Sequence, residues 1–279
     1  MKDLLTLLNC DKDTINLILN TAIQMRRIVM SDSKKAPQLI GKTVVGMFEQ
    51  DCLESNTLDL ACKYLSGNYV TSHPTQSWME VARAFDAMGA NLVAVKNQND
   101  SFLDALSKVS NASIVNMGSK LYNPVRVLTI LMVLKTKLDG LQNICVGALG
   151  NGDVSVMAEL DYCLSLYGSN LVWYLPKDDI STPKKGVVLN NLQNVFSGAD
   201  AILDLGLAPF AQGERYYGSN FGIQKELLDL ARVDAPLIGS RNYFEKRGVA
   251  EYLNNTVNTE YSCYIAICMA LLYIKTKNL

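Results

Sequence analysis

The chain has 279 residues and a formal net charge of -1, because 26 Lys and Arg oppose 27 Asp and Glu. Hydrophobic residues make up 49% of it, which is enough for a large buried core and excludes a disordered or collagen-like protein. The balanced charge provides no field of one sign, so no nucleic-acid partner is expected.

The seven cysteines are odd in number and form no Cys-x-x-Cys pair, which predicts reduced thiols in a cytoplasmic protein. Asp3 and the lack of a long apolar run argue against a signal peptide at the start. With a single histidine, no zinc site of ordinary type is expected, and no metal or cofactor is predicted. The longest apolar stretches, residues 127–134 and 263–274, fall short of the roughly 20 residues that a membrane span needs, so no membrane partner is expected.

Apolar periodicity alternates between helical and strand-like patterns along the whole chain. In the first half, Asp13 is expected to cap a helix with the inner face Ile15, Ile18, Leu19, Ala22, Ile23 and Met25. Short apolar runs predict buried parallel strands at residues 43–48, 69–70, 91–95 and 113–116. Helical patterns lie at residues 53–65, 78–88 and 102–106, and Pro124 begins a long apolar helix that reaches about residue 134.

The alternation restarts in the second half of the chain. Strands are predicted at residues 144–147, 171–174, 201–205 and 236–238, with a weaker segment before residue 201. Helices are predicted at residues 154–167, 224–232 and 259–274. Two successive strand–helix series, joined near residues 124–140, predict an α/β fold with two parallel-sheet domains.

A glycine-rich turn, residues 147–152, follows a strand and opens a helix. Its glycines fall at the first, fourth and sixth positions, whereas a dinucleotide fingerprint needs the first, third and sixth. The next residue, Asp153, would repel a phosphate at the helix N-terminus. The pattern therefore favours a tight strand–helix turn over nucleotide binding.

Several segments, in order, resemble the aspartate/ornithine carbamoyltransferase family and more closely its aspartate branch. Residues 39–44 leading to Phe48-Glu49 resemble the family's first strand, ARAFDAMGA at residues 82–90 resembles its ARTLEAMGAD segment, and LDGL at residues 138–141 resembles its LDGLKV segment. The resemblance runs from about residue 3 to residue 275.

This resemblance implies the carbamoyltransferase fold. A carbamoyl-phosphate-type domain would comprise residues 1–133, with a C-terminal helix in residues 259–279 packing back on it. An amino-acid-type domain would comprise residues 134–258. The resemblance also implies a homotrimer with active sites at subunit boundaries.

The phosphate-binding motifs of the family are changed here. After Phe48-Glu49 the family has a Ser-Thr-Arg-Thr-Arg loop at a helix N-terminus, where this chain reads Asp51-Cys52-Leu53-Glu54-Ser55. Lys96 matches a family arginine after the third strand. Where the family has His-Pro-Thr-Gln, this chain has Asn123-Pro124-Val125-Arg126, in which Asn123 can still donate a hydrogen bond and Arg126 can still bind an anion.

The amino-acid-binding motifs are changed as well. The family arginine that holds the substrate carboxylate falls on Asp153, and the family's Arg-x-Gln falls on Gly206 and Ala208. Its His-Pro-x-Pro loop corresponds to residues 239–242, and the guanidinium groups that select a dicarboxylate are missing.

A His-Pro-Thr-Gln sequence does occur, at residues 73–76, far upstream of Asn123. An exposed turn is its default interpretation, because Pro and Thr favour turns. The resemblance places the segment on the family's mobile loop, which makes His73 and Gln76 candidates for entering a neighbouring subunit's pocket.

Two functional hypotheses follow. In the first, the chain is a non-catalytic homologue with both sites dismantled, kept as a homotrimer for a structural, regulatory or ligand-binding role, including association with an active paralogue or binding of an unknown small molecule. In the second, it is a transferase of the same family acting on a changed substrate pair. The candidate cleft residues are Asp51, Cys52, Glu54, Lys96, Asn123 and Arg126, and no catalytic residue is assigned. Cys52 would be the nucleophile to suspect, since a helix N-terminus lowers the pKa of a thiol while adjacent acids oppose that shift.

Overall fold

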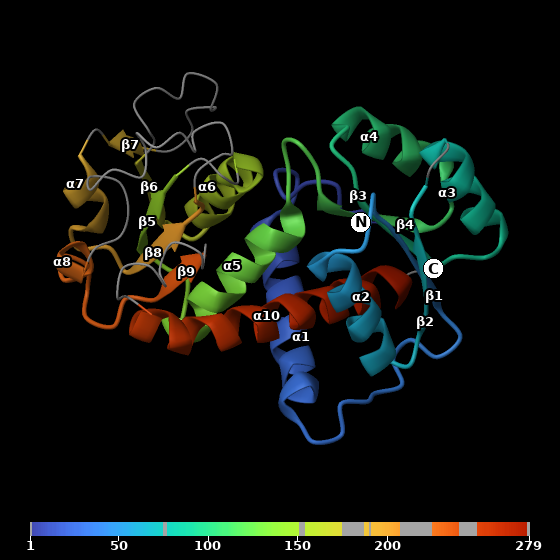
Figure 1. The fold of residues 1–279 in the computed structure, drawn as a ribbon, viewed down its shortest axis with the longest axis horizontal. Coiled ribbons are helices and arrows are strands. Elements are labelled where there is room, and N and C mark those ends of the chain that lie inside the picture. Colours follow the sequence, from blue (N-terminus) through green and yellow to red (C-terminus); the bar gives the residue numbers. More distant parts are fainter. Residues whose placement is uncertain are drawn as a thin grey trace. The chain divides into compact units, whose positions relative to one another are not determined.

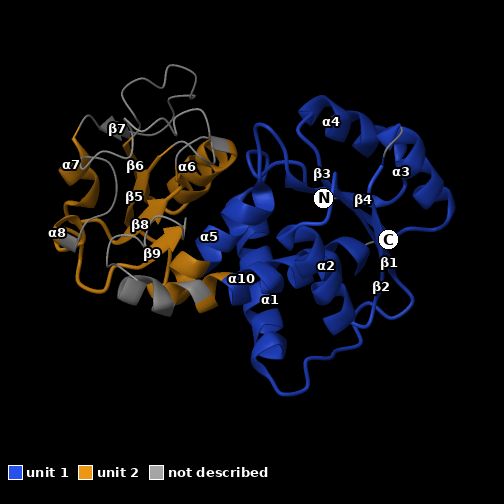
Figure 2. Ribbon diagram, in the orientation of Figure 1, with its two compact units in different colours: residues 1–132, 261–279 blue, residues 133–260 orange. Residues whose placement is uncertain are grey.

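The computed structural model describes residues 2–74, 77–150, 154–174, 187–189, 191–206, 225–239 and 250–277. The chain divides into two compact units (Figure 2). Unit 1 comprises residues 1–132 and 261–279, and unit 2 comprises residues 133–260.

Unit 1 is built on a four-stranded parallel sheet in the order β2-β1-β3-β4. Its strands are β1 (Thr43–Met47), β2 (Asn68–Ser72), β3 (Leu92–Lys96) and β4 (Ser113–Gly118). The helices that alternate with them are α1 (Lys12–Met30), α2 (Leu53–Tyr64), α3 (Trp78–Ala87) and α4 (Asp100–Val109). The apolar runs of β1 and β3 are buried, as expected of strands covered on both faces, and β4 is buried throughout although it contains the polar residues Ser113 and Asn116, whereas β2 is a partly exposed edge strand.

The first helix begins two residues earlier than predicted. Asp11, and not Asp13, is its N-cap, because the Asp11 carboxylate accepts a hydrogen bond from Thr14 N at 2.8 Å. Asp13 instead lies in the first turn, where its charge complements the helix dipole. The predicted inner face is buried except at Ile23, which is half-buried.

Helix α5 (Pro124–Lys137) begins at the predicted proline and continues past residue 134. The last helix, α10 (Ala250–Lys277), starts nine residues before the predicted position. Residues 250–258 are too polar to show apolar periodicity, which explains the late prediction. Both helices cross the boundary between the two units.

The C-terminal part of α10 packs back on unit 1, as predicted. Arg26 Nε of α1 donates to Ser262 Oγ at 2.9 Å, where Figure 1 shows α10 in red crossing α1 in blue. Near its end, Ser113 Oγ of β4 donates to Lys275 O, and Lys275 Nζ donates to Asp3 O, both at 3.0 Å. These bonds join the two ends of the chain to the central sheet.

Unit 2 carries a five-stranded parallel sheet in the order β7-β6-β5-β8-β9. Its strands are β5 (Cys145–Leu149), β6 (Asn170–Tyr174), β7 (Val187–Leu189), β8 (Ala201–Asp204) and β9 (Leu237–Gly239). The connections contain a 3₁₀ turn η1 (Val154–Val156) and the helices α6 (Met157–Ser165), α7 (Leu192–Phe196) and α8 (Lys225–Leu228).

Three predictions for unit 2 need adjustment. The helix expected at residues 154–167 begins as a 3₁₀ turn, and the one expected at 224–232 is a single turn, α8. The weak segment before residue 201 contains both β7 and α7. The predicted fold class, two parallel-sheet α/β domains with a C-terminal helix returning to the first, is confirmed.

All seven cysteines are free thiols, and five of them are buried. None of the helices in the described part of the chain combines the length and hydropathy of a membrane-spanning segment.

Candidate functional site

The sheet order of unit 1 selects one crevice for a ligand. The connection after β1 leads to β2 on one side, and the connection after β3 leads to β4 on the other side. The two connections therefore leave β1 and β3 in opposite directions. Ligands of open parallel sheets bind at the carboxyl ends of the strands at such a switch point. A cavity of about 130 Å³ lies there, and it is lined by Phe48, Glu49, Gln50, Cys52, Lys96, Asn97 and Gln98.

Two local features shape this cavity. Helix α2 begins directly after it, with Cys52 at the N-cap, so the free N–H groups and the positive end of the helix dipole lie at the cavity wall. A register shift after Val95 pairs Lys96 with Gly118, whose φ of 137° suits glycine. Such an irregularity at a strand end re-aims the side chain, and Lys96 lines the cavity.

Glu54 and Lys96 form an ion pair at this helix terminus. Lys96 Nζ donates to Glu54 Oε1 at 2.7 Å, and the two side chains are 34% and 31% exposed. Burial by itself would raise the pKa of the Glu54 carboxyl, but the hydrogen bond from Lys96, a backbone hydrogen bond and the charge of Lys96 together outweigh it, so that pKa is lowered. The cation that faces the cavity is therefore neutralised by an acid from the same unit.

Asp51 is also paired. His73, just beyond β2, places Nε2 at 3.1 Å from Asp51 Oδ1 and Nδ1 at 3.1 Å from Phe48 O. Asp51 is 79% exposed, so this contact lies at the surface of the 48–52 segment. Gln76, the other loop candidate, lies outside the described residues.

Cys52 does not have the environment of an activated thiol. Burial raises the pKa of its thiol and the neighbouring Glu54 carboxylate adds to the rise, which together outweigh the opposing effects of a backbone hydrogen bond at Ser55 and of the Lys96 charge. A raised pKa leaves less thiolate at neutral pH, so the geometry opposes the nucleophilic role considered from the sequence.

Asn123 and Arg126 lie at the start of α5. Asn123 Oδ1 accepts a hydrogen bond from Arg126 N at 3.2 Å and so caps the helix. The Asn123 amide lies against Gly118, beside the Lys96 side chain. Sequence reasoning missed Tyr264 of α10, whose pKa is raised well above its ordinary value by burial and further by Cys268 and Glu54, against an opposing effect of Arg126.

The strand order of unit 2 also switches direction between β5 and β8, the position at which open parallel sheets bind ligands. Asp204 ends β8 at this edge and accepts one hydrogen bond, from Gly206 N at 2.7 Å. Burial raises the pKa of the Asp204 carboxyl to about 6. The turn after β5 is tight because a Cβ on Gly150 would overlap Gly206 O, which supports a structural role for that glycine.

The structure describes only some of the unit 2 positions that correspond to the family's amino-acid-binding motifs. Asp153, Ala208 and residues 240–242 lie outside the described residues, whereas Gly206 and Gly239 are described. Within the described part of the chain, no group of three or more His, Cys, Asp or Glu side chains is arranged to hold a metal ion.

Comparison with known proteins identifies the family. The family model described as "Aspartate/ornithine carbamoyltransferase, carbamoyl-P binding domain" matches residues 2–136. An aspartate carbamoyltransferase catalytic subunit of Pelotomaculum thermopropionicum is 29% identical over 99% of this chain and 96% of that protein. The chain belongs to the aspartate/ornithine carbamoyltransferase family.

Solved structures show the same carbamoyltransferase fold. An ornithine carbamoyltransferase from Thermus thermophilus matches with a TM-score of 0.84 and 21% identity over 99% of both chains. An aspartate transcarbamoylase from Trypanosoma cruzi, solved with carbamoyl aspartate and phosphate, matches with a TM-score of 0.78 and 14% identity over 98% of this chain and 95% of that chain.

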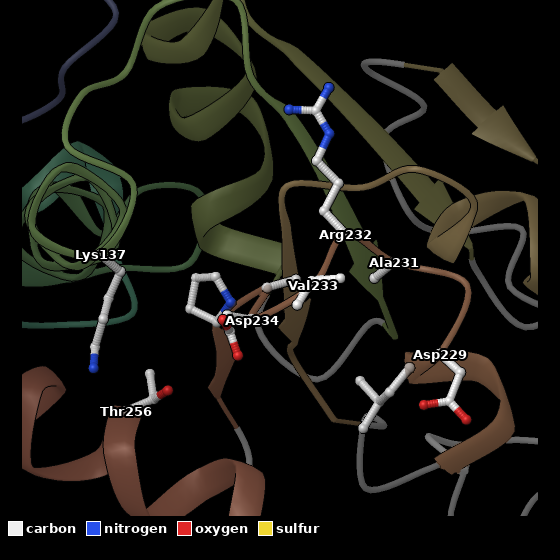
Figure 3. Close-up of a pocket in the computed structure, with 10 residues that line it drawn as sticks. Lys137, Asp229, Ala231, Arg232, Val233, Asp234 and Thr256 are labelled. Atoms are coloured by element: carbon white, nitrogen blue, oxygen red, sulfur yellow. The ribbon is translucent and has the colours of Figure 1, made fainter.

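A larger cavity, of about 680 Å³, lies in unit 2 (Figure 3). Lys137, Thr256 and the 228–236 segment, which leads into β9, line it. Arg232 pairs there with Asp200, whose second oxygen accepts from Cys145 N at 2.8 Å. In Figure 3 the Arg232 side chain extends away from Lys137 and Thr256. These contacts tie the segment before β9 to the amino-terminal ends of β8 and β5.

Proposed function

We propose that this chain is a non-catalytic member of the carbamoyltransferase family, in which the carbamoyl-phosphate and amino-acid sites are both dismantled. The observation that carries the proposal is the Glu54–Lys96 ion pair at the N-terminus of α2, beside the switch-point cavity of unit 1. The role that we propose for the protein is structural, regulatory or ligand-binding.

The ion pair places the protein's own anion where a helix terminus would otherwise attract a phosphate. Free N–H groups and the helix dipole favour one negative charge there, and Glu54 in the first turn supplies it. A phosphate would have to displace Glu54 from Lys96 and then remain near the released carboxylate. Two unit charges 4 Å apart repel by about 4 kcal/mol at an effective dielectric constant of 20.

Asp51 adds a second carboxylate to the same segment, and His73 is its described partner. The stabilisation of a transferring carbamoyl phosphate depends on preorganised donors aimed at the developing charge. Acids in this segment act in the opposite direction, which supports loss of the parent reaction.

The proposal extends to assembly and ligand. Relatives named catalytic subunits support an oligomer, and we propose a homotrimer that mixes with an active paralogue or binds a small molecule such as an amino acid. The alternative, a transferase with a changed substrate pair, would need an activated group such as Cys52, and the raised pKa of that thiol disfavours it.

The test is isothermal calorimetry of the full chain with carbamoyl phosphate and with inorganic phosphate, combined with assays for citrulline and carbamoyl aspartate. We expect no heat at millimolar ligand and no product. Micromolar binding of carbamoyl phosphate, or formation of either product, would contradict the proposal.

The Glu54→Gln variant tests whether the ion pair is the reason for the proposed loss of phosphate binding. Removal of the carboxylate frees Lys96 and deletes one repulsive charge, so phosphate should bind at least about tenfold more tightly than to the parent chain. Asp59→Asn is the matched control, because Asp59 lies on the same helix, pairs with Lys63 at the same 2.7 Å and removes the same charge. Equal effects of both variants would indicate general electrostatics and not the ion pair at the cavity.

A further inference from the structure

The only histidine of the chain connects the end of β2 to the wall of the cavity. His73 follows β2 directly, and its two ring nitrogens contact two different groups, Phe48 O and Asp51 Oδ1, each at 3.1 Å. Phe48, Glu49, Gln50 and Cys52 line the cavity, so both contacts hold the segment that forms its wall.

Both partners of the ring are hydrogen-bond acceptors. A backbone carbonyl has no proton to donate, and an ionised carboxylate has none either. A neutral imidazole carries one N–H and one lone pair, so it can satisfy only one of the two, and its lone pair would face an oxygen. The doubly protonated imidazolium has two N–H donors and satisfies both. Only the doubly protonated ring can therefore donate to both acceptors at once.

Other charged groups near the segment do not replace this contact. Glu49 lies on the segment itself, while Glu54 of α2 and Lys96 of β3 are engaged with each other. The 37% exposure of the His73 side chain leaves the ring open to protons from solvent. Histidine is the side chain whose charge ordinarily changes between about pH 5 and 8.

We propose that His73 is a proton-operated latch, which in its doubly protonated form holds the 48–52 segment against the end of β2 and in its neutral form releases one of the two contacts. Raising the pH loosens the wall of the cavity and lowering it fixes the wall. The latch controls ligand access to the cavity. This inference rests on the proposed function in one respect only, which is that it takes this cavity to be the ligand site.

The test measures the segment itself, without any ligand. Hydrogen–deuterium exchange of peptides covering residues 48–53 is followed in the full chain at about pH 5.5 and about pH 8, and each rate is corrected for its intrinsic pH dependence. Loss of one charge-assisted hydrogen bond corresponds to a roughly tenfold change in the opening equilibrium of the segment. The protection factor should therefore fall by that amount at the higher pH. His73→Gln, which cannot change its charge, should show no such pH-dependent change in protection, which is called the exchange step below.

Asp51→Asn should reduce this pH-dependent change, whereas Asp59→Asn, which removes a half-buried acid from α2, should leave it unchanged. Nitrogen NMR of the sole imidazole gives a second reading. At the lower pH both ring N–H protons should be protected from exchange, and at the higher pH one should be absent.

Unchanged protection in the parent chain, an equal step in His73→Gln, or two freely exchanging ring protons at low pH would each overturn the latch. Binding of carbamoyl phosphate with an intact exchange step would refute the proposed function and leave the latch in place. The two failures are therefore distinguishable.

Discussion

Asp204 should make unit 2 less stable at neutral pH than an uncharged residue would. The carboxyl group ends β8, is only 6% exposed and accepts one backbone hydrogen bond, from Gly206 N. Burial raises its pKa from 3.8 to about 6. We predict that Asp204→Asn stabilises unit 2 above pH 6, because the amide oxygen can still accept from Gly206 N without carrying a charge.

The magnitude follows from the shift. The folded state binds the proton more tightly than the unfolded chain, so ionised Asp204 destabilises the fold above a pH of about 6, and the penalty is absent below 3.8. Each pKa unit corresponds to about 1.4 kcal/mol, which gives a penalty of about 3 kcal/mol above pH 6. The advantage of Asp204→Asn should therefore shrink between about pH 6 and 4.

Urea unfolding followed by tryptophan fluorescence can isolate unit 2. The chain has two tryptophans, and Trp173 lies fully buried in β6 of unit 2. In a Trp78→Phe background, Trp173 alone reports the transition. If Asp204→Asn were less stable than its parent at pH 8, or if the difference did not change with pH, a partner must neutralise the carboxylate and the reasoning would fail.

Asp86 provides the contrast, since its carboxylate accepts hydrogen bonds from Ser110, Asn111 and Ala112. Although burial opposes them, these bonds lower the pKa of Asp86. Its stabilising effect is thus present above the unfolded pKa and lost as the pH falls through the lower folded value. Asp86→Asn should destabilise unit 1 at neutral pH by about 1–2 kcal/mol, with a difference that disappears in acid, as Trp78 fluorescence can report.

Two further predictions concern unit 1. Asp11→Ala should lower the midpoint of urea unfolding through loss of the helix cap, and Asp13→Ala should lower it less, whereas the reverse order would contradict the assigned cap. Gly46→Ala should cost about 1–3 kcal/mol, because the added methyl group would overlap the Tyr69 hydroxyl, and a Tyr69→Phe background should recover part of that loss in thermal unfolding.

Much of the fold could be predicted because each buried strand is a short apolar run. The strands β1, β3, β5 and β8 all fall within or beside their predicted ranges. The start of α10 could not be predicted, since its first turns are polar and show no apolar face. Helix α7 and strand β7 are too short to produce a periodic signal.

The candidate site was less accessible from the sequence. The resemblance indicated Glu54 and Lys96 as separate changes, but the residues are 42 positions apart and their pairing depends on adjacent strand ends. The contact of His73 with Asp51 likewise spans 22 positions. Asp204 lies within an apolar run that predicts a strand, and nothing in the local pattern signals the buried carboxyl at its end.

The distribution of charge distinguishes two ways in which a binding site can be lost. Deletion of arginines alone would leave the N-terminus of α2 as an uncompensated positive end, still able to attract an anion. In this chain Glu54 lies in the first turn of that helix and holds Lys96 at 2.7 Å, so the terminus and the lysine are both neutralised from within. An external anion gains nothing from either unless it first breaks the pair. The proposed loss of carbamoyl-phosphate binding thus follows from an added interaction as well as from missing donors, and the Glu54→Gln variant separates these two contributions.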